Sequence, residues 1–490
     1  MKALAFDIGT TKICSLVFDA ENGRTLEVLH GANTFVPSVR PWERIQDPEA
    51  VFRIVEGMYL TMMKKHAPIG GIGISCQMHG ILYVDSEGRA LSPFYTWQDG
   101  SGALPFRDGK TYTEYLSGLA AKTFRGNSPA VPYTPAAGYG LVTHFYHRSA
   151  GTVPAGTSKL CTIGDYIAMR LCGAARPVMH ATNACALGFF DPRSSCFDIE
   201  TLEAAGIDTA LLPRAAGDFA PAGEIRGTCG NGSVPVAAAV GDNQAGFLGS
   251  VRGADKGALV NMGTGGQISL IGGTDGNSGG EKYPDEQSPL ERRPYFEGKF
   301  LCSGASLCGG KAYAMLEEFF RAVLRMAGVP NAVPLYGAME DALRKDEDTQ
   351  SPEEPLLVNT MFEGSRRDPL PRGWIKNISS ANFTPAALIR GFLEGMAEEL
   401  YGMLPEGRRG EASAASPMEK ITFLAGSGNG IRRNAFLRRV IEKKFALPLM
   451  IPLHEEEAAF GAALYALICA GRFRGTAEAA RLIRYQGETP

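Results

Sequence analysis

A carboxylate, a glycine and two threonines stand together near the start of the sequence. Asp7 ends a short apolar run, and a second apolar run covers residues 13–18. The turn between the two runs contains Gly9, Thr10 and Thr11. Glycine permits a tight turn, amides and hydroxyls donate to anionic oxygens, and a carboxylate can hold Mg²⁺ through its waters. The segment indicates a magnesium–phosphate site on a β-hairpin, with an ordinary type I′ hairpin as the alternative.

A similar turn occurs near the start of the second half of the chain. Residues 259–271 form an apolar run, then Gly263, Thr264 and Gly265, and then another apolar run. One such turn means little, because short glycine motifs recur by accident. Two of them, each opening half of the chain, indicate two related domains that hold one nucleotide from opposite sides.

Asp242 is the candidate for proton transfer. It follows an apolar run at residues 235–241 and precedes Asn243. A carboxylate at the end of a buried strand can face a cleft, where it could accept the proton of a hydroxyl that attacks a phosphate. An aspartate that caps a helix N-terminus would have the same local pattern, so the residues alone leave both roles open.

The two turns resemble the phosphate motifs of the sugar-kinase, Hsp70 and actin superfamily. The resemblance implies an α/β fold of two ribonuclease H-like domains, residues 1–246 and 247–490, with a nucleotide and substrate cleft between them. It also implies ATP and Mg²⁺ as ligands, with Asp7 at the metal, Thr10 and Thr11 at the γ-phosphate, and Thr264 farther along the phosphate chain.

The superfamily likeness also implies an adenosine motif near the C-terminus. A buried strand is expected at residues 422–425, and a helix is expected to begin near Asn434. Small residues between them would let the backbone approach a nucleoside, and a helix start would supply free amides. A flexible glycine loop before a helix is the plainer alternative. The residues that we expect to border the nucleotide here are Gly426, Gly428, Gly430 and Asn434, together with Gly310.

The segment 241–245 resembles the catalytic segment of the FGGY carbohydrate kinases, which implies that Asp242 is the general base. Other parts of that family's pattern recur in order at residues 73–80, 96–100 and 362–366. The resemblance covers the chain from residue 7 to residue 463. Within the family it is nearest to the members that phosphorylate the seven-carbon ketose sedoheptulose, although residues 262–265 follow the general family form.

A polyol acceptor needs several hydrogen-bonding groups and one flat apolar wall. Donors and acceptors can come from Gln77, His79, Asp99 and Asn243, and Trp97 can form the wall. The family likeness adds Met78 to these contacts. Taken singly, His79 could be a structural histidine and Trp97 a core aromatic.

Length and composition limit the classes of protein to which the chain can belong. At 490 residues the chain exceeds one typical core, which agrees with two domains. A formal charge of −3 gives no reason to expect binding to nucleic acid or membranes. The ten cysteines contain no CxxC pair, which favours reduced thiols in a cytoplasmic protein. A homodimer is a possible assembly.

We therefore expect an ATP-dependent kinase of a ketose, most simply of sedoheptulose. Xylulose, ribulose or glycerol are alternative acceptors, and an actin- or Hsp70-like ATPase is an alternative of another class. A phosphatase of the same superfamily is disfavoured by the adenosine motif. We further expect residues 81–84 to pair as a continuation of a strand at 69–75, and residues 100–158 to be largely irregular.

Overall fold

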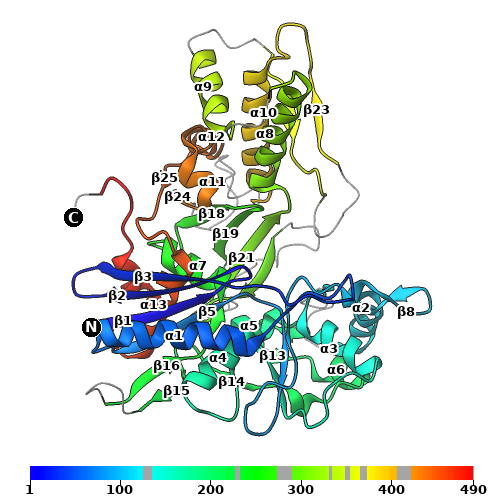
Figure 1. The fold of residues 1–490 in the computed structure, drawn as a ribbon, viewed down its shortest axis with the longest axis vertical. Coiled ribbons are helices and arrows are strands. Elements are labelled where there is room, and N and C mark those ends of the chain that lie inside the picture. The colour runs from blue at the N-terminus through cyan, green and yellow to red at the C-terminus, as the bar shows by residue number, and fades with distance from the viewer. Residues whose placement is uncertain are drawn as a thin grey trace, which may run out of the picture.

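A computed structural model of the protein describes residues 1–124, 135–226, 232–272, 290–329, 334–347, 354–364, 372–404 and 421–488. These residues form two lobes, each built around a mixed β-sheet (Figure 1). The lower lobe in that view contains the N-terminal strands, and the upper lobe contains most of the second half of the chain. None of the helices in these ranges is long and apolar enough to cross a membrane.

The first sheet has the order β15-β16-β5-β1-β2-β3, and β17 pairs with the end of β5. The strands β1, β2 and β3 form an antiparallel meander, whereas β5 runs parallel to β1. The bounds are β1 (Lys2–Ile8), β2 (Lys12–Asp19), β3 (Arg24–Ala32), β5 (Gly71–Cys76), β15 (Pro221–Ile225), β16 (Val234–Ala237) and β17 (Val240–Gly241). The predicted N-terminal hairpin is thus confirmed as β1–β2.

The second sheet repeats this topology. Its order is β20-β21-β19-β18-β24-β25, in which β18, β19 and β21 form the antiparallel meander and β24 runs parallel to β18. The bounds are β18 (Gly257–Met262), β19 (Gly266–Gly272), β20 (Glu291–Pro294), β21 (Phe300–Ser306), β24 (Phe423–Ser427) and β25 (Leu449–Met450). Each glycine–threonine turn therefore joins the first two strands of one meander, which is the arrangement that the two hairpins predicted.

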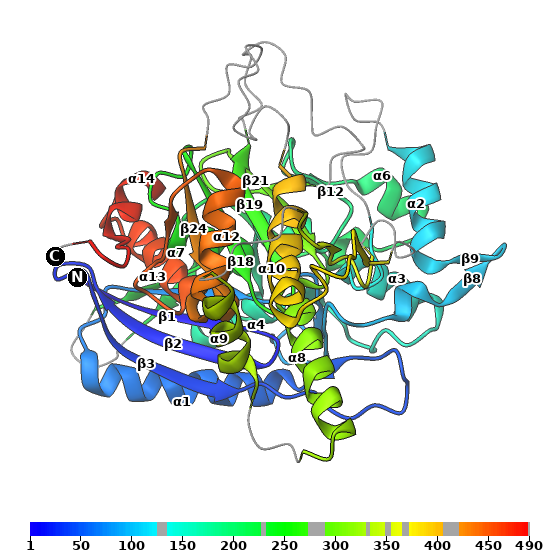
Figure 2. The same ribbon diagram turned by 90° about the horizontal axis from the view of Figure 1, so that it is seen from above.

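Side-chain size explains which helices cover each face of the first sheet. Along β1, the large residues Leu4 and Phe6 pack with the helices α1 (Pro48–His66) and α4 (Ile163–Leu171), whereas the alanines between them pack with α13 (Glu457–Cys469). Alternate residues of a strand point to opposite faces. A Cβ on Gly73 of β5 would lie 1.9 Å from the backbone oxygen of Ala462, so only small residues allow this close approach. Figure 2 shows α1 and α13 on opposite sides of β1, β2 and β3.

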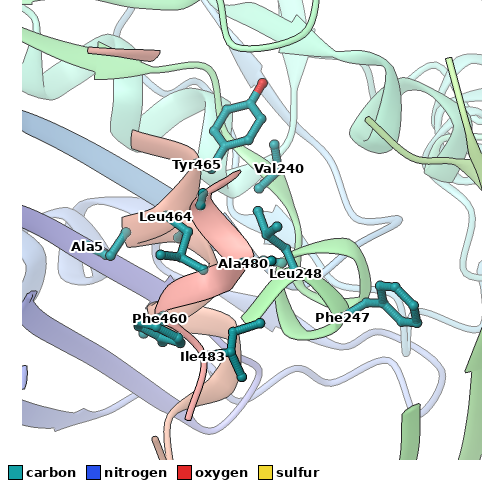
Figure 3. Packing of buried hydrophobic residues seen from close by; sticks show 14 of the residues in the cluster. Ala5, Val240, Phe247, Leu248, Phe460, Leu464, Tyr465, Ala480 and Ile483 are labelled. Carbon is teal, nitrogen blue, oxygen red and sulfur yellow. The ribbon is translucent and has the colours of Figure 1, made fainter. Parts of the chain in front are cut away.

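The two lobes share their central helices. α13 belongs to the second half of the sequence yet packs on the first sheet, and α7 (Asp242–Ser250) from the first half packs with residues of the second sheet. The helices touch through their backbones, because a Cβ on Gly461 would lie 1.8 Å from the oxygen of Ala245. Side chains such as Phe247, Leu248 and Tyr465 surround this contact (Figure 3). The expected domain boundary between residues 246 and 247 falls inside α7.

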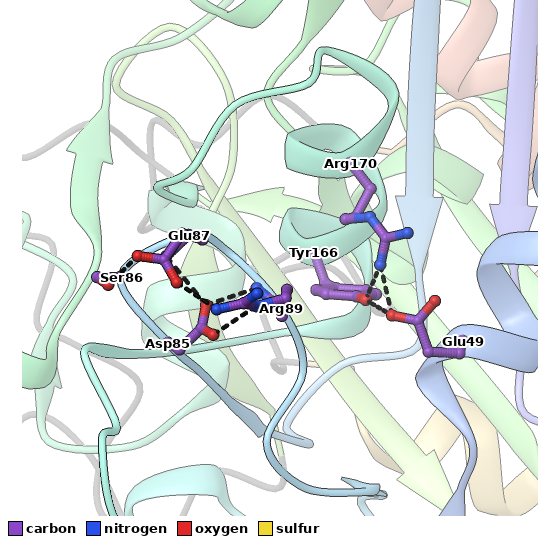
Figure 4. A network of polar contacts seen from close by, with 7 residues as sticks. All are labelled: Glu49, Asp85, Ser86, Glu87, Arg89, Tyr166 and Arg170. Atoms are coloured by element: carbon purple, nitrogen blue, oxygen red, sulfur yellow. Dashed lines mark hydrogen bonds and ion pairs between the residues drawn. The ribbon is translucent and has the colours of Figure 1, made fainter.

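An ion pair and a hydrogen bond join α1 to α4 on the outer face. Arg170 and the hydroxyl of Tyr166 both contact the Glu49 carboxylate, and the Arg170 guanidinium lies 4.2 Å from the centre of the Phe52 ring (Figure 4). An adjacent turn is closed by Arg89, whose Nε donates to Asp85 over 2.8 Å.

Helices cover the outer face of the second sheet and extend from it. They are α8 (Gly309–Met326), α9 (Tyr336–Glu347), α10 (Pro385–Gly402), α11 (Gly428–Arg433) and α12 (Ala435–Phe445). A short hairpin of β22 (Leu357–Asn359) and β23 (Trp374–Lys376) packs beside α10. The expected strand at 422–425 and the helix after residue 434 are confirmed as β24 and α12. The low-complexity stretch at 406–417 lies outside the described residues.

Smaller elements extend the first lobe beyond its sheet. They are the helices α2 (Tyr112–Thr123), α3 (Gly140–Ser149), α5 (Ala181–Ala186) and α6 (Ile199–Ala204), and the short strand pairs β4 (Ile45–Gln46) with β7 (Phe94–Tyr95), β6 (Leu82–Val84) with β10 (Lys159–Cys161), β8 (Pro105–Arg107) with β9 (Lys110–Thr111), β11 (Val178–His180) with β14 (Arg214–Ala216), and β12 (Phe190–Asp191) with β13 (Cys196–Phe197). The short helix α14 (Thr476–Ala479) closes the fold beside α13.

Two expectations about this region were wrong. Residues 100–158 contain the helices α2 and α3, because Leu116 and Ala120 recur at helical spacing in the core and Thr111 starts α2 with a capping box. Residues 81–84 do not continue β5 in the main sheet, since β6 pairs with β10. The chain turns away between them at His79, whose φ is 75°.

Candidate functional site

Three adjacent parallel strands bring the predicted first-lobe residues together. In the register of the sheet, Ser75 of β5 lies beside Asp7 of β1 on one side and Val240 of β17 on the other. Asp7 is near the carboxyl end of β1, Gln77 directly follows β5, and Asp242 directly follows β17. Because the carboxyl ends of parallel strands meet at one edge of a sheet, these residues from distant parts of the sequence share one site.

Asp242 is the first residue of α7 and is partly exposed. Its Oδ1 accepts a hydrogen bond from the backbone N–H of Asn243 over 2.8 Å. Burial and the nearby charge of Asp7 raise the pKa of the Asp242 carboxyl to about 7, although that N–H and the charge of Arg293 oppose the rise. A carboxylate with this pKa can accept a proton near neutral pH.

Asp7 is the second carboxylate of this edge. Its Oδ1 accepts a hydrogen bond from the Ser75 hydroxyl over 2.5 Å. Burial raises the pKa of Asp7 to about 6, and the charge of Glu456 adds to the rise while Lys12 opposes it. Carboxylate oxygens are donors that Mg²⁺ prefers, so Asp7 fits a magnesium ion at this edge.

A cavity of about 700 Å³ opens in front of Asp242. Its walls come from both halves of the chain, including β19, β20, β21 and α10 from the second half. The sequence-predicted residues that line it are Thr10, Gln77, Met78, His79, Trp97, Asp242 and Asn243. This volume lies in the range of small-molecule sites.

A hydrogen-bonded chain links the expected sugar wall to the first phosphate hairpin. Trp97 Nε1 donates to Thr10 Oγ1 over 2.9 Å, and Thr10 Oγ1 donates to Gln77 Oε1 over 3.2 Å. Gln77 Nε2 in turn donates to Gln46 Oε1 over 2.8 Å. The indole of Trp97 is held by its edge while 40% of the residue stays exposed, so its face can contact a ligand.

His79 is held in an uncommon conformation. Its φ of 75° lies in the left-handed region, where residues other than glycine are uncommon outside special sites. Its Nδ1 donates to the backbone oxygen of Ala186 over 2.8 Å, and its ring stacks on Tyr139 with 4.4 Å between the centroids.

Asp99 lies apart from this group. Only 2% of its surface is exposed, its carboxylate accepts the backbone N–H of Ser101 over 3.0 Å, and it is absent from the described residues that line the cavity. Burial raises its pKa. The structure thus gives Asp99 a role in shaping the turn after Trp97.

The glycines of the second half bring three backbone segments into contact. The N–H of Gly310, at the start of α8, donates to the oxygen of Gly263 in the β18–β19 turn over 3.0 Å. A Cβ on Gly310 would lie 2.2 Å from that oxygen, and a Cβ on Gly428 would lie 2.6 Å from the oxygen of Met262. The β18–β19 turn, the start of α8 and the start of α11 therefore meet at one end of the second sheet.

The other predicted nucleotide residues have identifiable structural roles. Gly9 closes the β1–β2 turn through an N–H bond to the Lys12 oxygen over 3.0 Å, and Thr11 is exposed beside it. Thr264 accepts the N–H of Lys311 through its backbone oxygen over 2.9 Å. Asn434 caps α12, because its Oδ1 accepts the N–H of Leu437 over 2.9 Å.

Close packing accounts for the remaining glycines. A Cβ on Gly265 would lie 2.7 Å from the oxygen of Ser306. A Cβ on Gly430 would lie 2.8 Å from the oxygen of Met262, and one on Gly426 would lie 2.9 Å from the side chain of Ile431.

Sequence reasoning missed the cavity residues that come from the second half. They are Gln267, Glu291, Arg293, Ser303, Ala305, Val358, Asn359, Met361, Trp374, Gly395, Glu398, Glu399, Gly402 and Met403. The one local signal was an arginine pair in front of the apolar residues 294–296. Next to the first hairpin, Lys12 Nζ contacts the Glu456 carboxylate over 2.8 Å, with 49% of the lysine side chain exposed.

Comparison with known proteins supplies independent information. A model of the N-terminal domain of the FGGY family of carbohydrate kinases matches residues 2–249. The chain is 28% identical to sedoheptulokinase of Mus musculus over 422 residues, which cover 81% of each chain. It is 27% identical to sedoheptulokinase of Homo sapiens over 464 residues, or 87% of each chain. The structure of xylulose kinase from Rhodospirillum rubrum superposes with a TM-score of 0.77 at 18% identity, covering 100% of this chain and 93% of that one.

Proposed function

This chain belongs to the FGGY family of carbohydrate kinases and is an ATP-dependent carbohydrate kinase, and from that premise we propose that it phosphorylates a ketose with Asp242 as the general base. The observation that carries the proposal is the position of Asp242. Its carboxylate follows a buried strand, borders the cavity and has a pKa raised to about 7. It would accept the proton of the acceptor hydroxyl as that oxygen attacks the γ-phosphate.

The acceptor would lie across the first-lobe wall of the cavity. Trp97 offers an aromatic face, while Gln77, His79 and Asn243 offer hydrogen-bonding groups. Met78 adds an apolar contact. Asp99 would act by supporting the turn that carries Trp97.

The nucleotide would lie where the two lobes face each other. Thr10 and Thr11 in the first hairpin and Thr264 in the second are proposed to bind the phosphates, and the glycine-rich starts of α8 and α11 are proposed to border the nucleoside. Asp7 would hold Mg²⁺, which when bound supplies neutralisation of phosphate charge. In this assignment residues 1–246 form the sugar-binding domain and residues 247–490 the adenosine-binding domain.

Sedoheptulose is the acceptor that we propose. Two relatives at 27–28% identity that match more than four-fifths of the chain are sedoheptulokinases. The cavity volume of about 700 Å³ is ample for a seven-carbon sugar. Xylulose, ribulose and glycerol are the competing acceptors within the family.

The test is a panel of these four acceptors with ATP and a coupled assay of ADP release. We expect kcat/KM to be highest for sedoheptulose and the product to be its terminal phosphate. A pentulose or glycerol as the best acceptor would contradict the sedoheptulose assignment while leaving the kinase reaction in place. ADP release at the same rate with and without every acceptor would point to an ATPase.

A further inference from the structure

The cavity contains one strong cation among its described lining residues, and it comes from the second lobe. Arg293 lies on the edge strand β20 and is 8% exposed. Burial of a guanidinium is costly unless it is paired, and replacing a buried ion pair by apolar residues is often neutral or stabilising. A contribution to fold stability therefore explains poorly why an arginine is buried at position 293. Its place on a cavity wall indicates that it binds a ligand.

The partners of Arg293 leave donors available. Its Nη2 donates to Glu291 Oε2 over 2.7 Å, and its Nη1 lies 3.6 Å from the sulfur of Met78. Thioether sulfur is a weak acceptor, whereas a guanidinium has five N–H donors. Glu291 also lines the cavity, with 37% of its side chain exposed. The pair can thus offer donors and acceptors side by side.

Met78 sets the spacing between this pair and the proposed base. The Met78 sulfur would lie 2.9 Å from a Cβ placed on Gly241, the residue before Asp242. Arg293 Nη1 lies 3.6 Å from the same sulfur. The Met78 sulfur thus contacts both Arg293 and the segment that carries the base, and a ligand whose reacting hydroxyl lies at Asp242 can reach Arg293 with its more distant hydroxyls.

Polar neighbours continue the same wall. In the sheet register Glu291 lies opposite Ser303, and Gln267 lies opposite Ala305, so these residues face the cavity from one side of the second sheet. An anionic acceptor would meet Asp242 and Glu291 as well as Arg293. A neutral chain of hydroxyls can instead accept from Arg293 and donate to Glu291.

We propose that Arg293 and Glu291 bind the hydroxyls of the acceptor that are distal to the phosphorylated end, and that they determine the preference for a long ketose over a short acceptor. This inference rests on the proposed ketose kinase function. A shorter acceptor bound at the base would make fewer hydrogen bonds to this pair, and unpaired buried polar groups penalise the shorter ligand.

The test compares kcat and KM for sedoheptulose, xylulose and glycerol at saturating ATP. Arg293→Met removes the guanidinium, Arg293→Lys retains a charge, and Glu291→Gln retains the shape of the carboxylate. Arg292→Met is the matched control, because Arg292 is the preceding residue of the same strand and lies on the opposite face, where its guanidinium carbon is 3.7 Å from the centre of the Phe300 ring. Thermal unfolding of each variant confirms that it is folded.

We expect Arg293→Met to lower kcat/KM for sedoheptulose roughly 10- to 100-fold, the loss expected for a hydrogen bond to a charged group, mainly through KM. The kcat/KM for glycerol should change less than about threefold, since glycerol makes no such contact. Arg293→Lys should keep part of the preference for sedoheptulose over glycerol, and Arg292→Met should keep all of it. Profiles of kcat/KM against pH separate this effect from a change in the pKa of Asp242, which would alter all acceptors together.

A uniform loss for all three acceptors, or an unchanged ratio of sedoheptulose to glycerol in Arg293→Met, overturns the inference while the ketose kinase function stands. If the wild-type protein turns over none of the ketoses, the proposed function fails and the inference fails with it.

Discussion

Replacing Asp242 by asparagine should remove activity and stabilise the ligand-free protein. Turnover should fall by about 10²–10⁴, the usual contribution of a general base. The folded variant should be more stable because the ionised Asp242 carboxylate destabilises the folded wild-type protein, and asparagine carries no charge. A rise of the pKa from 3.8 to about 7 corresponds to about 4 kcal/mol against the ionised form, at about 1.4 kcal/mol for each pKa unit.

Because Asp242 is partly exposed to the cavity, solvent screening reduces this cost, and we expect a gain of about 2 kcal/mol above pH 7. The sign follows from the raised pKa. The folded state favours the protonated acid, so wild-type stability falls as pH rises from about 4 to about 7. The difference between the variant and the wild type should therefore vanish near pH 4 and be constant above pH 7.

The assay is urea unfolding without nucleotide or Mg²⁺ at pH values from 4 to 8.5. Asp108→Asn is the matched control, because Asp108 is an exposed turn residue with a φ of 53° that asparagine adopts equally well. Equal stability of Asp242→Asn and wild type at pH 8 would refute the argument that the site destabilises the charged base.

Three further predictions follow from the site. The kcat/KM for the acceptor should rise with pH through about 7, because Asp242 must be ionised to accept a proton; a flat profile between pH 5.5 and 8.5 would place the base elsewhere. Gly310→Ala should raise the KM for ATP at least about tenfold, because the added Cβ would lie 2.2 Å from a backbone oxygen of the second hairpin and would displace the backbone there. A displacement of about 1 Å can cost on the order of 10²-fold. Gly337→Ala, with no atom within 4 Å of the added Cβ, should leave the KM for ATP unchanged. Finally, the lobes should close around the sugar and a non-hydrolysable ATP analogue to exclude water; small-angle scattering should show a smaller radius of gyration, and an unchanged one would count against closure.

Local pattern was sufficient to place Asp7 and Asp242 at strand ends, although it left the role of Asp242 open. Asp7 and Asp242 each follow an apolar run in the sequence, and the parallel pairing of β1, β5 and β17 brings them together. The two glycine–threonine hairpins were recognisable because each requires only a few consecutive residues. Each hairpin supplies the first two strands of one of the two sheets.

The rest of the cavity depends on long-range packing that local pattern does not contain. Arg293 and Glu291 reach the cavity because β20 is the edge strand of the second sheet. The hydrophobic pattern of a strand does not show whether that strand lies at the edge or in the centre of a sheet. Asp99 was predicted to contact sugar from its type and position, yet the turn that it stabilises buries it. A buried carboxylate and a ligand-binding one share the same local sequence signal.

The most direct test of the account is phosphoryl transfer from ATP to sedoheptulose by the wild-type protein and by Asp242→Asn, with the sugar phosphate identified directly by mass spectrometry. We expect the wild type to form the phosphate in equal amount to ADP, and the variant to lose at least 99% of this turnover while it still binds ATP, since a general base contributes about 10²-fold or more. Retention of more than about a tenth of wild-type turnover by the variant would contradict the role of Asp242 as the base.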